Sequence, residues 1–297
     1  MLKLLIDVSG GIAGDMFAAA LLSVGADFEL VRAAMLQAAA KLGSAQISSV
    51  ETSDGSTQLK IELQSNRAHL RGSEAREILA DLFDEFAVKE EYSTFGLKAL
   101  EILLAAEIRA HREYNIVIEE DSAHSHHHNR QHNNAHHHKQ NHDQKPHHSH
   151  NHDSNHDHNQ KHNHNHHHGE DSFLHEAQDI VIDIIGAVLG LQDLSIEPRA
   201  RLLTPVSVGG GTVKCSHGIL PVPAPAAQII LDRYGIARQK GPIETELSTP
   251  TGMSILAALG VQKPVPAALE DKKIVSTGQS RGTKVLDIPP LKIYLTG

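Results

Sequence analysis

The sequence contains one cysteine, no tryptophan and few aromatic residues. Because Cys215 is the single thiol, an internal disulfide framework is excluded, and the composition is typical of a reducing compartment. Phe and Tyr number only six and four. A hydrophobic core must therefore be built mainly from Leu, Ile, Val and Ala, for which a hydrophobic content of 40% is adequate.

The sequence also lacks an excess of positive charge and any long apolar run. Lys and Arg number 27 against 36 Asp and Glu, a net charge of −9 with histidine neutral, which argues against a nucleic-acid-binding surface. No apolar run has membrane-spanning length, and residues 1–11 lack the basic and apolar regions of a signal peptide. We therefore expect a cytoplasmic protein with neither a nucleic acid nor a membrane as partner.

Histidine, in contrast, is abundant and concentrated. Of the 24 histidines, 20 lie between His124 and His168, among Asn, Asp, Gln and Lys. Such a polar segment buries too little apolar surface to offset its chain entropy, so residues 119–171 are predicted to be a disordered loop. Imidazole binds nickel, copper and zinc alike, although drift in a tolerant loop is an alternative origin. The histidines chosen as metal ligands in this tract are His126, His127, His128, His136, His137, His138, His166, His167 and His168.

Helix and strand patterns alternate on both sides of the tract. The sequence predicts a mixed α/β fold, with a mixed sheet and covering helices, in which residues 1–118 and 172–297 are two parts of one domain. Local signals include a turn at Ser53–Ser56 between two strands and helix starts at Asp27, Ser73 and Pro225. Further helices are expected over about 14–24, 94–113, 173–191 and 252–259, and strands over 2–8, 202–208, around 215, and near 274 and 293.

Four polar residues lie together near the start of the helix predicted over 173–191. Spacings of four place His175, Asp179 and Asp183 on one helical face, and Glu176 is close to the same face. The residues between them are apolar, so the helix is expected to be buried and its carboxylates to require a metal, a partner or a substrate. We interpret these four residues as metal ligands, ahead of the alternative that the acidic side of the helix simply faces water.

A second pair, Glu107 and His111, lies at helical spacing on the element that enters the tract from the other side. Such a pair is commonly an ordinary surface contact. Its position, mirroring His175 and Glu176 across the tract, favours a role as metal ligands. His69 and Arg71 follow an alternating strand and could hold an anion.

Two turns are candidate anion-binding sites. The glycine turn Gly10–Gly14, flanked by Asp7 and Asp15, allows backbone N–H groups to approach an anion at a helix N-terminus, or is simply a tight strand-to-helix turn. At Thr249-Pro-Thr-Gly252, two hydroxyls and free N–H groups could bind phosphate or carboxylate, although a Thr N-cap explains the pattern nearly as well. From these turns we predict Asp15, Thr249, Thr251 and Gly252 as residues that bind an organic cofactor.

His217 lies between a glycine-rich strand end and a rigid segment with prolines at 221, 223 and 225. It is a candidate metal ligand or acid–base group. Cys215 would point to the same side of a strand, but a lone cysteine is usually buried packing and is not assigned a role.

Several of these motifs, in this order, resemble one family. They are Gly14-Asp-Met16, His69-Leu-Arg71, Ala106-Glu107 with His111, the histidine tract, His175-Glu176, Asp179-x-x-x-Asp-Ile-Ile-Gly186, His217-Gly-x-Leu-Pro-Val-Pro-Ala-Pro225 and Glu246-Leu-x-Thr-Pro-Thr-Gly252. The family is the nickel-insertion protein of nickel-pincer cofactor assembly, which serves lactate racemase maturation.

The resemblance implies a nickel chelatase acting on pyridinium-3,5-bisthiocarboxylic acid mononucleotide. It implies that nickel is placed between two sulfurs and bonded to a ring carbon, in a reaction that uses CTP with a divalent cation, Mn or Mg. A base must remove the ring proton, and His217, Glu176 and His175 are equally open candidates. The implied partners are the small-molecule precursor and an apo lactate racemase-like enzyme, and a homo-oligomer is expected. The alternative function is a non-catalytic nickel store or metallochaperone, for which the tract alone would suffice.

Three features depart from the family pattern. Gly10 and Ala13 replace the usual serines of the first turn, and only Ala177-Gln178 separates His175-Glu176 from the Asp, where the family has Val-Gly-Ala. The chain also stops at Gly297, where many relatives continue into a domain associated with CTP. We therefore expect this domain to be absent and a separate C-terminal domain protein to be a possible partner.

Overall fold

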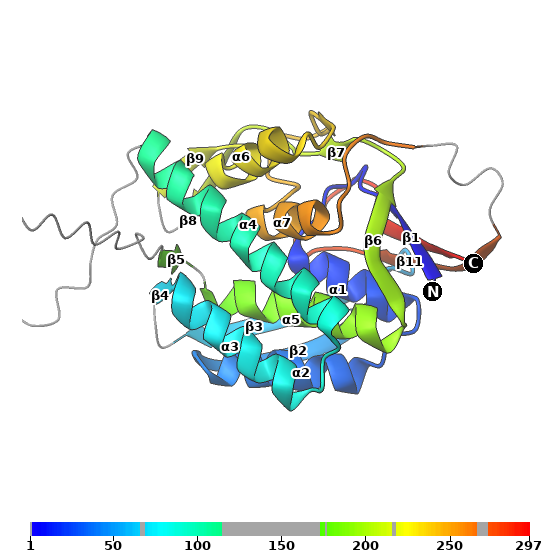
Figure 1. The fold of residues 1–297 in the computed structure, drawn as a ribbon. Coiled ribbons are helices and arrows are strands. Elements are labelled where there is room, and N and C mark those ends of the chain that lie inside the picture. The colour runs from blue at the N-terminus through cyan, green and yellow to red at the C-terminus, as the bar shows by residue number, and fades with distance from the viewer. Residues whose placement is uncertain (1, 66–68, 115–172, 176, 216–217, 266–272) are drawn as a thin grey trace, which may run out of the picture. The chain divides into compact units, whose positions relative to one another are not determined.

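The largest sheet of the fold is mixed, as predicted (Figure 1). The computed structural model describes residues 2–65, 69–114, 173–175, 177–215, 218–265 and 273–297. The sheet has the strand order β2-β3-β11-β12-β1-β6, and β1 pairs antiparallel with β12 but parallel with β6. The bounds are β1 Leu2–Asp7, β2 Gly43–Glu51, β3 Thr57–Ser65, β6 Ile196–Leu202, β11 Ile274–Ser280 and β12 Leu291–Thr296.

The helices pack around one almost wholly buried helix, α5 (Ala177–Asp193). It contacts α1, α2 and α4, which explains why its sequence is apolar on every side. Figure 1 shows α4 lying between α6 and α7 on one side and α3 and α5 on the other. The bounds are α1 Gly14–Ser23, α2 Phe28–Ala40, α3 Gly72–Glu85, α4 Glu90–Tyr114, α6 Pro225–Tyr234 and α7 Pro250–Ala258. The mixed α/β fold class is thus confirmed.

The start predicted for the helix over 173–191 is wrong. Residues Phe173–His175 form strand β5, which pairs antiparallel with β4 (His69–Arg71) so that His69 is opposite His175. Helix α5 begins only at Ala177. His175 therefore does not share a helical face with Asp179 and Asp183. The pairing partner lies about a hundred residues away in the sequence, so the local pattern could not reveal it.

Local turn and cap signals were mostly reliable. Asp27 caps α2, its Oδ1 accepting from Glu29 N–H at 2.8 Å and Leu30 N–H at 3.1 Å. Pro225 opens α6, and strands β2 and β3 flank the predicted turn. Ser73 is not the cap of α3, because the helix begins at Gly72 and Glu74 accepts from the Arg71 N–H instead.

Two other expected elements differ in their bounds. Helix α4 begins at Glu90 rather than Thr94. The run 202–208 is divided between the end of β6 and the short strand β7 (Val206–Ser207). Strand β7 pairs with β10 (Arg238–Gln239), and β8 (Thr212–Cys215) pairs with β9 (Gly218–Pro221).

The chain divides into two compact units, one formed by residues 1–118 with 170–297 and the other by residues 119–169. The second unit lies outside the described residues, as do the tract histidines predicted as ligands, so the disordered loop stays a prediction. Among the helices of the described ranges, none combines the length and apolarity that a bilayer crossing requires.

Candidate functional site

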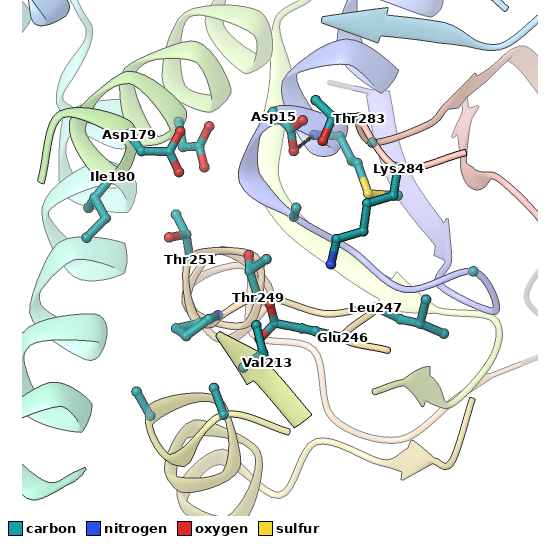
Figure 2. Close-up of a pocket in the computed structure, with 18 of the residues that line it drawn as sticks. Asp15, Asp179, Ile180, Val213, Glu246, Leu247, Thr249, Thr251, Thr283 and Lys284 are labelled. Atoms are coloured by element: carbon teal, nitrogen blue, oxygen red, sulfur yellow. Dashed lines mark hydrogen bonds between the residues drawn. The ribbon is translucent and has the colours of Figure 1, made fainter. Parts of the chain in front are cut away.

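A cavity of about 370 Å³ opens between the starts of α1, α5 and α7, the later part of α4 and the β8–β9 hairpin. Its remaining wall is the segment Arg281–Pro290, which connects β11 to β12 and which we call the strap. The volume is within the range of small-molecule sites. Figure 2 shows side chains from these separate elements directed toward a common space.

Asp15 brings a carboxyl group to the cavity from the first turn of α1. Its Oδ1 accepts a hydrogen bond from the Met16 N–H at 2.8 Å, so one N–H group of the first helical turn is already satisfied by this carboxylate. Burial nevertheless raises the pKa of Asp15 to about 6, from a usual value of 3.8. The side chain is thus poised to carry or release a proton near neutral pH.

The glycine turn before α1 is shaped by close packing. A Cβ built on Gly10 would lie 1.8 Å from the Pro289 carbonyl oxygen. The Ile12 N–H donates to the Leu247 carbonyl at 2.9 Å and approaches the Ser248 hydroxyl at 3.2 Å. These contacts favour the tight-turn interpretation over an anion cradle, because small residues are needed against neighbouring backbone and the Ile12 donor is already used.

Asp183 is the most deeply buried carboxyl group of the cavity wall, with 3% of the residue exposed. Its Oδ1 has no hydrogen-bond partner within the described ranges. A Cβ on Gly14 would lie 2.2 Å from Asp183 Oδ2, so glycine at this position is what admits the carboxyl beside α1. Burial, followed by the nearby charges of Asp179 and Asp15, raises the pKa of Asp183 well above its usual range.

Two helices that flank the histidine tract in sequence meet at this cavity. Asp179 and Asp183, one turn apart on α5, line it together with Glu107 of α4. His111 is not among the lining residues but lies beside Glu107, with 3.9 Å between Nε2 and Oε2. Burial lowers the pKa of His111 and so favours the neutral imidazole that binds metals.

Helix α7 brings Thr249 and Thr251 to the cavity. Thr249 is an N-cap, because its Oγ1 accepts from the Gly252 N–H at 3.2 Å. Gly252 itself packs against the glycine turn, where an added Cβ would lie 2.5 Å from the Ile12 carbonyl oxygen. The Gly252 N–H is therefore already used within the helix cap, as the N-cap alternative predicts, while the side chains of Thr249 and Thr251 line the cavity.

Several lining residues carried no assignment from the sequence, namely Glu246 and the strap residues Arg281, Thr283 and Lys284. The only sequence signal for the strap is the segment Gly282-Thr-Lys284 between two strands. This segment matches no motif of defined spacing, so it did not indicate a ligand site. Figure 2 shows Lys284 reaching into the cavity, with Thr283 near Asp15. The lysine of the site thus comes from a loop, as does Glu246, while the other lining carboxyl groups, those of Asp15, Glu107, Asp179 and Asp183, come from helices.

Other predicted ligands cannot be placed. His217, Glu176 and the tract histidines lie outside the described residues, and of His175 only the backbone is described. In the described ranges, no group of three or more His, Cys, Asp or Glu side chains is arranged to hold a metal ion. The part of the site that is described therefore offers individual oxygen ligands and not a closed coordination sphere.

A family model described as "Nickel insertion protein" matches residues 4–295. The chain belongs to the nickel insertion protein family. A putative nickel insertion protein of Syntrophobacter fumaroxidans is 42% identical over 123 residues, 40% of this chain and 30% of the relative.

Two further relatives are named pyridinium-3,5-bisthiocarboxylic acid mononucleotide nickel insertion proteins. The one from Clostridium kluyveri is 39% identical over 120 residues, 40% of this chain and 28% of the relative. The one from Staphylococcus saprophyticus is 38% identical over 122 residues, 40% of this chain and 29% of the relative. The matched stretch thus spans less than a third of each of these relatives. No solved structure matches the chain significantly.

Proposed function

We propose that the chain is a nickel chelatase that inserts nickel into pyridinium-3,5-bisthiocarboxylic acid mononucleotide. The observation that carries the proposal is the cavity carboxyl of Asp183, which is 3% exposed and whose Oδ1 lacks a partner in the described part of the chain. A buried polar group without a partner is costly unless a ligand or ion completes it. Membership of the nickel insertion family supports nickel as that ion.

In this proposal, nickel is the substrate and the carboxylates hold it briefly. Asp179, Asp183 and Glu107 supply oxygen ligands at one cavity wall, and His111, His175 and Glu176 add to them. Because oxygen ligands bind nickel less tightly than thiolates or imidazoles, a loosely held ion passes readily to the two sulfurs of the precursor. Nickel binding to Asp183 would displace a proton, since its raised pKa favours the neutral form.

Insertion also requires a base. As the carbon–nickel bond forms, the ring C–H bond between the two thiocarboxyl groups breaks, its electron pair goes to nickel and the proton passes to the base. His217, Glu176 and His175 remain the proposed acceptors.

For the organic substrate, we propose binding by Asp15, Thr249 and Thr251, all of which line the cavity. The Gly252 N–H is already bonded to Thr249 Oγ1, so no substrate contact is assigned to Gly252. The cavity does not fit CTP. Of the two cations among its described lining residues, Arg281 is paired with Asp54, so Lys284 alone faces five carboxylates: Asp15, Asp179, Asp183, Glu107 and Glu246. A triphosphate would be repelled there. CTP dependence with Mn or Mg stays a prediction, and no step is assigned to it.

The remaining partners are proposed on the same basis. A nickel-pincer product would pass to an apo lactate racemase-like enzyme, and we propose a homo-oligomeric state.

The proposal is tested by incubating the full chain with nickel, the mononucleotide precursor, CTP and Mn or Mg. We expect a nickel-containing product by mass spectrometry, and at least a ~10-fold loss of initial rate in Asp183→Asn, because a carboxylate ligand is removed without a change of volume. Asp287→Asn, on an exposed part of the strap outside the cavity lining, is the matched control. Full activity of Asp183→Asn would contradict the assigned site.

The same assay separates the enzyme from a nickel store. A store binds nickel but gives no nickel-containing mononucleotide. That result would reject the chelatase proposal.

A further inference from the structure

The strap is fixed at both ends against the glycine turn and the start of α1. Just before it, Ser280 Oγ donates to the Met16 carbonyl at 2.6 Å, and a Cβ built on Gly282 would lie 3.4 Å from the Met16 sulfur. At its end, the Pro289 carbonyl packs closely against Gly10. Its residues therefore have a defined position relative to Asp15.

The Arg281 side chain stabilises the strap through hydrogen bonds to strap carbonyls and an ion pair with Asp54. Its Nε and Nη2 contact Asp54 Oδ2, each at 2.6 Å, and its Nη1 donates to the carbonyls of Ile288 at 2.8 Å and Leu286 at 3.4 Å. The guanidinium charge is thus neutralised by Asp54 of the β2–β3 turn. Arg281 shapes the loop but has no spare charge for a ligand.

Lys284, three residues after Arg281, differs from it because its charge has no ion-pair partner in the described ranges. It lines the cavity, and within the described ranges it makes no ion pair or hydrogen bond. Figure 2 shows its side chain extending from the strap into the site, with the ammonium group on the side of Thr249 and Glu246. Lys284 is an exposed residue of a loop held this firmly, and an ammonium group without an ion pair in this position is suited to an anionic ligand.

The distribution of charge indicates which part of the precursor Lys284 meets. Asp179 and Asp183 lie on α5, and Asp15 on α1, at the wall where nickel and the cationic ring are expected. Such a wall repels a phosphate dianion. The phosphate must therefore lie away from it, and the strap side combines an ammonium group with the hydroxyl of Thr249.

On the basis of the function proposed above, we propose that Lys284 binds the phosphate monoester of the mononucleotide and sets the enzyme's preference for the phosphorylated over the dephosphorylated precursor. Thr249 lies on the same side and supplies a hydroxyl. Lys284 is thus a specificity-determining residue that takes no part in bond making at nickel.

The test compares two ligands with the full chain in the absence of nickel, by isothermal titration calorimetry. The probes are the bisthiocarboxylic acid mononucleotide and the nucleoside obtained by removing its phosphate. We expect Lys284→Gln to weaken nucleotide binding roughly 10- to 100-fold and nucleoside binding less than about 2-fold. Lys284→Arg should keep most of the nucleotide affinity, and Lys60→Gln, on an exposed strand position, should change neither.

The outcomes separate this inference from the proposed function. An unchanged nucleotide affinity in Lys284→Gln overturns the inference. An equal loss for both probes also overturns it, because the nucleoside retains both thiocarboxylates and the lysine would then serve those groups or the strap. If the unmodified chain binds the mononucleotide but yields no nickel product in the insertion assay, the function fails while phosphate recognition stands. If it binds neither probe, both are overturned.

Discussion

At the scale of single residues, the cavity is defined by carboxyl groups in environments that disfavour their charge. Asp183 is held between Gly14 and the charges of Asp179 and Asp15, and Asp15 combines burial with a helix N-terminus. Burial raises a carboxyl pKa while N–H donors lower it, and here burial prevails. Such groups reduce stability at neutral pH, a cost that a bound cation would offset.

Stability should therefore depend on pH through Asp15. Its pKa rises from 3.8 in the unfolded chain to about 6 in the fold, so between these values the folded state binds more protons. The free energy of unfolding therefore falls as pH rises from about 3.8 to about 6. Above this range Asp15 is ionised in both states, and the loss of stability has its full size. Asp15→Asn should stabilise the metal-free protein by roughly 1–3 kcal/mol at about pH 8, where the charge is buried, and have little effect near pH 4.

Thermal or urea unfolding at the two pH values measures this difference. Asp287→Asn, an exposed residue of the strap, should show no such pH dependence. An Asp15→Asn effect of equal size at both pH values would show that the charge of Asp15 is not the cause.

At the scale of elements, the site depends on segments that have no regular structure. The strap owes its shape to Arg281 and to the contacts that its two ends make with Met16 and Gly10. The β1–α1 turn is joined to the segment before α7 through Ile12 and Ser248. These connections link parts of the chain more than two hundred residues apart. They bring Asp15 and Thr249 to one cavity.

Arg281→Gln should loosen the strap. The substitution removes the ion pair with Asp54 and the bonds to Leu286 and Ile288, and should lower the free energy of unfolding by about 1–2 kcal/mol, discounted because both partners are partly exposed. Trypsin should then cleave after Lys284 faster, because local opening exposes this bond more often.

Arg238→Gln is the matched control, since it breaks the exposed pair with Asp232, in which Nη1 and Oδ1 are 2.7 Å apart. It should leave cleavage after Lys284 unchanged. If Arg281→Gln and Arg238→Gln are cut at Lys284 at the same rate, the arginine does not hold the strap.

At the scale of the whole molecule, the histidine tract joins the two helical regions that meet at the cavity. Residues 114 and 177 are the ends of α4 and α5 nearest to it in sequence, and Glu107 and Asp179 of these helices line one wall. We expect the tract to raise local nickel concentration and not to take part in insertion.

Deleting residues 124–168 should therefore leave the insertion rate intact at saturating nickel and reduce it at limiting nickel. The deletion removes 20 of the 24 histidines, so calorimetry should show a large fall in the number of nickel ions bound. Loss of activity at every nickel concentration, with the fold intact by circular dichroism, would place the tract within the chemistry.

Much of the element order could be predicted from sequence because its signals are local. Asp27 caps its helix with its own side chain, Pro225 has the backbone angle that a first helical position needs, and the turn at Asp54-Gly55 joins two alternating strands. The family, too, was recognisable from short motifs, and the match over residues 4–295 confirms it.

Other features were decided only by tertiary structure. His175 lies on a strand because β4 pairs with it, Asp183 becomes buried because Gly14 admits it beside α1, and Lys284 enters the cavity because Arg281 and Gly10 position the strap. Each depends on contacts between distant segments, which composition and periodicity do not encode. The sequence by itself determined the helices and most strands, the richness in metal ligands and the family; the packing decided which ligands share a cavity and where its charges lie.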